Sequence, residues 1–306
     1  DLNIKKSFLP VKFNFMIEGV NAVQISEVLK NSSFYRDISK YQTSDIHIHL
    51  NGISILPQGK NRAIIQGLEV TGLDVGDERA VKKAYESAAK EAEFLTDFLK
   101  KDFKEFENAR LLKVADSFYI RESVHFIGEY VLEANDILGN KNFDNKVAIG
   151  THAVDGSKFA RNSPYIIGKP ERYAVPLGSL VPLKIDNLLM IGNKISYSSL
   201  AASSAGTLGV GIMEGQAAGL VSVYSIVKDM SPREIVKKND KEINNEIKDL
   251  FMKYGLKMDD FHSENENGSQ WSYPHLKELI HLGLVAGGTD NNFGFGSEAS
   301  QQDFAT

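Results

Sequence analysis

The chain has 306 residues, 42% hydrophobic and 25% charged, a composition typical of a compact globular protein with one large domain or two ordinary ones. Its formal net charge is −5, and no basic patch indicates a nucleic-acid partner. The sequence contains no cysteine, which excludes a disulfide framework and a metal site built from thiolates.

The N-terminal part has the patterns of a mixed α/β domain. Apolar and polar side chains alternate from Val11 to Ile17, which predicts a half-buried strand, and residues 22–30 predict a short helix. Residues 44–55 and 63–70 predict two further strands, joined by a turn that contains proline and glycine.

Three side chains that could bind a metal lie in the second of these predicted strands. Asp45, His47 and His49 would share one strand face, because side chains alternate along a strand. A metal site is one interpretation. We prefer the other, a strand face turned toward solvent or substrate, and we predict no metal.

A long helix is predicted over residues 77–103. Asp77 is expected to cap it, with acidic residues in the first turn. The apolar stripe of this helix consists of Val81, Ala84, Tyr85, Ala88, Leu95, Phe98 and Leu99. Its charged residues are most simply a solvated face.

Residues 120–132, with the sequence IRESVHFIGEYVL, form an amphipathic segment. Arg121 and Glu122 stand at its start. An adjacent arginine and glutamate can form a buried ion pair or act as a catalytic unit, and the sequence leaves both readings open.

The stretch from Asp186 to Met230 is rich in glycine. An apolar run, 188–191, ends at Gly192 and predicts a buried strand. A loop of small residues follows, and a helix starts at about Gly206. This helix carries Gly209, Gly211, Gly215 and Gly219. Because glycine costs about 1 kcal/mol in a helix interior, several on one helix suggest the close approach of another backbone or of a flat ligand. The alternative is a tightly packed strand and helix without a ligand.

Gly192, the Ile195-Ser196 pair and the segment 215–219 resemble the C-terminal FAD-contacting motif of FAD-dependent oxidoreductases with a glutathione-reductase-like flavin domain. Residues 120–132 are similar to a second motif of the same family. Further matches are Phe106 to Arg110, Asp136 to Leu138, and Phe143 with Asp144. The resemblance covers roughly residues 60–230.

The resemblance implies that the predicted strand ends beside the flavin ribityl chain. The following helix would aim its N-terminus at the pyrimidine end of the flavin ring, where the reduced flavin is anionic. The implied cofactor-binding residues are Gly192, Asn193, Ser196, Ala205, Gly206 and Thr207.

The chain departs from the family pattern at several basic positions. Val124 and His125 stand where the family has a second basic pair, and Asn193 replaces an arginine. Between Ser198 and Gly215 there is neither histidine nor arginine. The remaining catalytic candidates are Arg121, His125 and Arg172, with His152 and Tyr165 as further candidates for binding or polarising a substrate. Each of them could equally be structural.

No Gly-x-Gly-x-x-Gly follows a strand in these 306 residues, although this fingerprint carries the pyrophosphate of FAD. The chain therefore resembles a substrate domain together with the returning part of a flavin domain. Asp1 in place of a start Met also indicates a mature form or a cut fragment. We expect FAD in the full-length protein, and weak or absent FAD binding by this chain alone.

The composition changes after Met230. Residues 231–254 predict a charged helix that ends at Gly255, and residues 259–268 a polar linker. Residues 269–306 resemble an S-layer homology module, with a predicted core of Trp271, Leu279, Leu282 and Phe304. Ser300-Gln301 replaces that family's Thr-Arg pair, which weakens the expectation of glycan binding. An unrelated helical hairpin is the alternative.

Together these patterns predict an α/β fold. We expect a substrate-type domain of mixed strands and helices over residues 1–185 and the C-terminal part of a flavin-binding Rossmann-like domain over 186–230. A helix and linker over 231–268 and a small helical module over 269–306 would follow.

The predicted function is that of the C-terminal portion of an FAD-dependent oxidoreductase that transfers a hydride between a small substrate and the flavin. The alternative is a non-catalytic protein of the cell surface or cell wall on a degenerate flavoenzyme fold. We expect a secreted or surface-associated bacterial protein, with cell-wall polysaccharide as a candidate partner and no membrane span.

Overall fold

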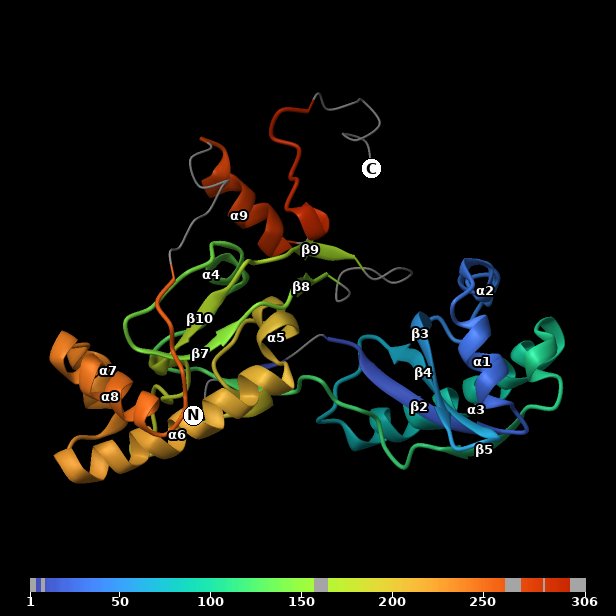
Figure 1. Cartoon of the computed structure of the whole chain (residues 1–306), viewed down its shortest axis with the longest axis horizontal. Helices are drawn as coiled ribbons and strands as arrows, with labels where there is room; N and C mark the ends of the chain where they lie inside the picture. The colour runs from blue at the N-terminus through green and yellow to red at the C-terminus, as the bar shows by residue number, and fades with distance from the viewer. Residues whose placement is uncertain (1–3, 7–8, 157–164, 262–270, 283, 298–306) are drawn as a thin grey trace. The chain divides into compact units, whose positions relative to one another are not determined.

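The computed structural model describes residues 4–6, 9–156, 165–261, 271–282 and 284–297 (Figure 1). The chain forms two compact units. Unit 1 comprises Asp1–Lys5, Val124–Phe159 and Tyr165–Thr306, and unit 2 comprises Lys6–Ser123 and Ala160–Pro164. The main boundary therefore falls after Ser123, whereas the sequence patterns placed it after residue 185. Residues 124–185 pack with the glycine-rich stretch because their strand β7 (Lys146–Gly150) lies against the helix of that stretch.

Unit 2 is built on a four-stranded antiparallel sheet with the strand order β3-β4-β2-β5. The strands are β2 (Val11–Glu18), β3 (Ile48–Gln58), β4 (Arg62–Val70) and β5 (Arg110–Val114). Buried and half-buried residues alternate through the whole of β2. This confirms the strand predicted from the alternating pattern.

Helices of unit 2 cover the buried face of this sheet. The longest is α3 (Glu78–Asp102), and the Asp77 carboxylate caps it by accepting the N–H groups of Arg79 (2.9 Å) and Ala80 (3.2 Å). Shorter elements are α1 (Ala22–Val28), α2 (Ser32–Ile38) and the 3-10 helix η1 (Lys104–Phe106). Leu95 and Leu99 of α3 share the core of the unit with Phe13 of β2. The predicted helices at 22–30 and 77–103 are both present.

The shared face predicted for Asp45, His47 and His49 does not form. The strand begins at Ile48, so Asp45 and His47 lie in the preceding turn, where the Asp45 carboxylate accepts the His47 N–H at 2.9 Å. Within the described part of the chain, no group of three or more histidine and acidic side chains could hold a metal ion.

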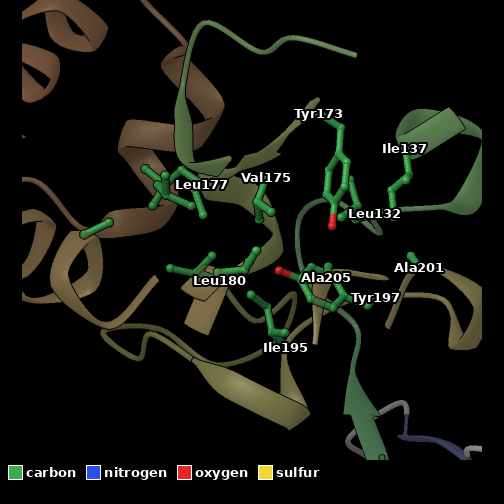
Figure 2. Packing of buried hydrophobic residues seen from close by; sticks show 14 of the residues in the cluster. Leu132, Ile137, Tyr173, Val175, Leu177, Leu180, Ile195, Tyr197, Ala201 and Ala205 are labelled. Atoms are coloured by element: carbon green, nitrogen blue, oxygen red, sulfur yellow. The ribbon is translucent and has the colours of Figure 1, made fainter. Parts of the chain in front are cut away.

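Unit 1 contains short sheets and several helices around a second core. Strand β7 pairs antiparallel with β10 (Tyr173–Pro176), β8 (Val154–Asp155) pairs antiparallel with β9 (Ile166–Gly168), and β1 (Ile4–Lys6) pairs with β6 (Val124–Phe126). Figure 2 shows the core, in which the rings of Tyr173 and Tyr197 lie among aliphatic side chains such as Leu132, Val175 and Ile195. The mixed α/β class is as expected.

Residues 188–191 do not form the predicted buried strand. Leu188 and Ile191 are exposed, and the Met190 N–H donates to the Leu180 carbonyl at 2.8 Å. A strand needs a ladder of such bonds to a neighbour. No strand among the described residues continues through this segment, and the chain instead enters the 3-10 helix η3 (Gly192–Lys194).

The predicted loop of small residues is mostly helical. Helix α5 (Ser199–Ala205) begins at the Ser198 cap, and helix α6 (Leu208–Lys228) follows after Gly206 and Thr207. By length and composition α6 could cross a membrane, contrary to the expectation that no segment reaches that size. A helix in the core of a globular protein can have the same length and composition. Helix α6 packs on β7 and buries the carboxyl group of Glu214.

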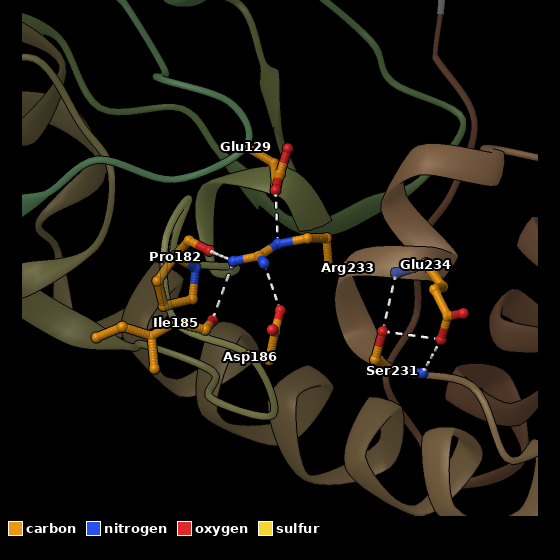
Figure 3. A network of polar contacts seen from close by, with 7 residues as sticks. All are labelled: Glu129, Pro182, Ile185, Asp186, Ser231, Arg233 and Glu234. Atoms are coloured by element: carbon orange, nitrogen blue, oxygen red, sulfur yellow. Dashed lines mark hydrogen bonds and ion pairs between the residues drawn. The ribbon is translucent and has the colours of Figure 1, made fainter.

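The charged stretch after Met230 forms two helices, not one. Helix α7 (Pro232–Lys238) ends at Asn239, whose φ is +40°, and Asp240 caps helix α8 (Lys241–Lys253). Arg233 of α7 lies between Glu129 and the segment 182–186 (Figure 3). Both helices are part of unit 1, because Ile235 and Phe251 belong to its core.

The C-terminal segment contains helix α9 (Tyr273–Leu282). Its core is different from the predicted one. Leu276 and Ile280 are buried in the core of unit 1, whereas Trp271, Leu279 and Leu282 are exposed. The reason is helical periodicity, because positions 276 and 280 share one face of the helix. Phe304, Ser300 and Gln301 lie outside the described residues, and the polysaccharide partner stays a prediction.

Candidate cofactor site

The segment from Ile191 to Ser198, here called the cofactor loop, lies beside helix α6 in unit 1. Gly192 has a φ of +71°, a conformation that favours glycine. Its N–H donates to Oε2 of Glu214 at 3.3 Å. That N–H is therefore occupied by the protein. Gly192 shapes the loop and does not offer a donor to a ligand, while Asn193 is exposed at the loop surface.

Ser196 faces the interior of unit 1. Its N–H donates to the Ser179 carbonyl (3.1 Å), and its carbonyl accepts the Leu132 N–H (3.0 Å). The Ser196 hydroxyl is buried and has no hydrogen-bond partner among the described residues. The side chain of Ser196, a predicted cofactor contact, is thus not accessible from the surface. The residue instead anchors the loop to the interior of unit 1.

His125 of β6 also holds the cofactor loop from the interior. Its Nδ1 lies 2.7 Å from the Ile195 carbonyl oxygen, and the imidazole is buried. Since a carbonyl only accepts, Nδ1 carries the proton. Of the three catalytic candidates, His125 is the one that the structure places against the loop.

The other candidates lie in different surroundings. Arg121 is half-buried in unit 2, next to the buried Glu122. Arg172 is exposed in unit 1, and its guanidinium carbon lies 5.7 Å from the centre of the Phe261 ring. His152 is exposed, and burial together with the nearby Asp155 raises the pKa of the half-buried Tyr165.

Glu214 forms a buried polar pair with Tyr197 under the loop. The Tyr197 hydroxyl donates to Oε1 of Glu214, while Oε2 accepts the Gly192 N–H. Burial raises the pKa of Glu214, and the hydrogen bonds from Tyr197 and Gly192 oppose that shift. Burial is the largest cause that holds the pKa of Tyr197 well above its usual range, and the negative charge of the neighbouring Glu214 is the next.

A second buried hydroxyl chain runs close to the first. The Ser204 hydroxyl donates to the His152 carbonyl, so the Tyr173 hydroxyl is the donor in its 2.9 Å hydrogen bond with Ser204. Burial is also the main cause that raises the pKa of Tyr173. Both phenols are therefore neutral groups of the core. They position α5 and α6 and do not titrate near neutral pH.

The first backbone N–H groups of helix α6 are not capped by a side chain. Ala205 is buried, and the Gly206 N–H donates to the Ala202 carbonyl at 2.9 Å, so neither offers an N–H outward. Thr207 is the N-cap, but its side chain accepts no N–H, and the first turn contains no acidic residue. The exposed N–H groups at this positive helix end therefore belong to Leu208 and Gly209, which were not among the cofactor-binding residues implied by the sequence.

The glycine face of α6, which consists of Gly211, Gly215 and Gly219 and is turned away from the buried residues of this helix, is apolar and open. A Cβ atom added at Gly209, Gly211 or Gly219 would meet nothing within 4 Å, and one added at Gly215 would meet only the Ile191 side chain at 3.7 Å. No other backbone among the described residues approaches these glycines, contrary to one of the two predictions. A flat ligand, the other prediction, has room along Gly211, Gly215 and Gly219, which share this side of the helix with the exposed Leu208 and Ile212, whereas Gly209 lies on another side.

Sequence reasoning missed Glu214, which lies in the run GIMEGQAAG. A single acidic residue in the middle of an apolar helix was the available signal, because a carboxyl on a core face needs specific partners. Tyr197 left no comparable signal.

A family model of FAD dependent oxidoreductases matches residues 16–247, which is more than half of the chain. No curated protein and no solved structure matched the chain in the same comparisons. The match begins within β2, ends within α8, and includes the whole cofactor loop and α6.

Proposed function

Since the chain belongs to the family of FAD dependent oxidoreductases, we propose that its cofactor loop and helix α6 form the flavin-ring end of an FAD site in a redox enzyme. The glycine face of α6 would lie along the ring, and the uncapped N-terminus at Leu208 and Gly209 would face its most negative part. These residues fit a flat, partly apolar anion, because the face is open and the helix end is positive.

The bound flavin would supply the redox chemistry by accepting a hydride from a small substrate. The protein residues would bind and orient. His125 would act through the Ile195 carbonyl by fixing the loop. Arg121 and Arg172 remain candidates for binding an anionic substrate. Because Lys194 is the only basic side chain within the cofactor loop, we propose a substrate of low negative charge.

The observation that carries this proposal is the helix end of α6, which is exposed and lacks both a side-chain cap and an acidic residue. Such a helix end favours a negatively charged ligand, because its N–H groups and its partial positive charge are not satisfied by the protein. A purely structural helix of this length commonly has a capping side chain, whose absence costs about 1 kcal/mol.

The test is an anaerobic titration of the chain with riboflavin, FMN and FAD, each in oxidised and reduced form. We expect similar affinities for the three oxidised flavins, because the pyrophosphate fingerprint is absent from these residues. We expect the reduced forms to bind more tightly. Because the pyrophosphate fingerprint is absent from these residues, we expect weak binding by this chain; a complete lack of binding by all three flavins in both redox states would contradict the proposal.

A matched variant separates the site from the fold. Thr207→Asp places a capping carboxylate at the helix end, so we expect the protein to be stabilised by about 1 kcal/mol. The same carboxylate would repel a reduced flavin. The preference for reduced over oxidised flavin should therefore be lost while the melting temperature rises.

A further inference from the structure

We infer that Glu214 is a positioning residue of the cofactor site, whose carboxyl group clamps the two ends of the cofactor loop onto helix α6. The inference rests on the proposed function for its link to the flavin. The clamp itself is a property of this chain and can be measured without a cofactor.

The position of Glu214 on α6 is unusual for an acidic residue. The buried residues of this helix are Val210, Glu214, Ala217, Val221 and Tyr224. Their spacing of three or four residues marks the face toward the core. A carboxyl group on such a face is unfavourable unless hydrogen bonds replace the lost water.

The hydrogen bonds that replace water come from the cofactor loop. Gly192 donates its backbone N–H from the start of the loop, and Tyr197 donates its hydroxyl from near the end. Each carboxyl oxygen accepts one of them. The two ends of the loop are therefore held at one point of α6.

The middle of the loop is held by other residues of unit 1. His125 donates to the Ile195 carbonyl at 2.7 Å, and Ser196 exchanges backbone hydrogen bonds with Ser179 and Leu132. The contacts from the interior thus fix residues 195 and 196, while Glu214 fixes residues 192 and 197. Without the Glu214 contacts, Gly192 and the exposed Asn193 would lose their hydrogen-bonded link to the helix.

The first measurement follows the Gly192 amide in 15N-labelled protein by hydrogen exchange, with the Ala217 amide of the same helix as internal reference. Glu214→Leu removes both acceptors, so we expect the protection of Gly192 relative to Ala217 to fall by about tenfold. Glu214→Gln keeps one carbonyl acceptor and should recover part of the protection.

Two further variants act as comparison and control. Tyr197→Phe removes only the hydroxyl and leaves the Gly192 acceptor in place, so its effect on Gly192 should be smaller. Gln216→Leu alters an exposed residue of the same helix, which bonds the Tyr254 carbonyl at 3.1 Å, and should leave the Gly192-to-Ala217 ratio unchanged.

The second measurement titrates the same variants with oxidised and reduced riboflavin. We expect Glu214→Leu to weaken binding by about tenfold or more, with partial rescue in Glu214→Gln. The control for binding is Asp259→Asn, an exposed residue outside the cofactor loop and α6, which should leave the flavin affinity unchanged. An unchanged Gly192 ratio in Glu214→Leu would overturn the clamp, and so would lost protection with full flavin affinity. If the unaltered chain binds no flavin, the proposed function fails, and the amide ratio still reports separately whether Glu214 holds the loop.

Discussion

The ammonium group of Lys146 on β7 lies 2.7 Å from the carboxylate of Asp260, which follows helix α8. The Lys146 side chain is only 5% exposed, whereas that of Asp260 is 67% exposed. Lys248 reaches the other oxygen of the same carboxylate at 2.6 Å. This contact ties the start of the predicted polar linker to the strand that supports α6.

This ion pair makes part of the stability dependent on acid pH. The hydrogen bonds from Lys146 and then Lys248 lower the pKa of Asp260 to about 2, below its ordinary value of 3.8. A depressed pKa contributes stability above the unfolded value and loses it as the pH falls through the folded one. We therefore expect the free energy of unfolding to decrease between about pH 4 and pH 2.

The variant Asp260→Asn tests that assignment by denaturant unfolding at several pH values. At neutral pH we expect a loss of about 1 kcal/mol, a modest figure because the carboxylate is largely exposed. Between pH 4 and pH 2 the variant should show a flatter pH dependence than the unaltered protein. Asp259→Asn is the control, and an equal flattening there would assign the effect to net charge.

Arg233 is expected to be a main polar support of the loop before the cofactor site. It is 17% exposed and contacts Glu129 (2.8 Å), Asp186 and the carbonyls of Pro182 and Ile185. Arg233→Lys keeps the charge but loses the fork of donors, so we expect a loss of about 2 kcal/mol in urea unfolding. The control variant Arg36→Lys changes an exposed arginine, and it should lower the free energy of unfolding by less than about 0.5 kcal/mol.

The open glycine face of α6 predicts a stabilising substitution. Gly219→Ala adds a methyl group that meets no atom within 4 Å, so higher helix propensity should raise the stability by about 0.5–1 kcal/mol. Gly128→Ala is the contrast, because its Cβ would lie 2.6 Å from the Gly178 carbonyl oxygen and should cost about 1–3 kcal/mol. A loss of stability in Gly219→Ala would show that another part of the protein approaches this face.

The packing of helix α9 predicts which apolar residues matter for stability. Ile280 is buried in the core of unit 1, and Ile280→Ala should cost about 2–4 kcal/mol. Trp271 is 85% exposed, so Trp271→Ala should change the stability by less than about 0.5 kcal/mol. Thermal unfolding of the two variants gives the answer, and a large effect of Trp271→Ala would support the S-layer-like core instead.

The elements that the sequence predicted correctly depend on local rules. The alternation from Val11 to Ile17 placed β2, and Asp77 marked the start of α3, because side-chain periodicity and end capping act within a few residues. The glycine and Ile-Ser spacing also indicated the FAD dependent oxidoreductase family, which the match over residues 16–247 supports.

Contacts between distant residues decided the rest. Residues 188–191 have the composition of a strand, but no described strand pairs with them. Leu276 and Leu279 look equivalent in the sequence, yet only Leu276 faces the core. Gly192 and Tyr197, the hydrogen-bond partners of Glu214, lie 22 and 17 residues before it in the sequence. Such a pairing depends on how the loop folds back on α6, because a hydrogen bond requires the donor and acceptor to meet in space and neither residue type specifies the other.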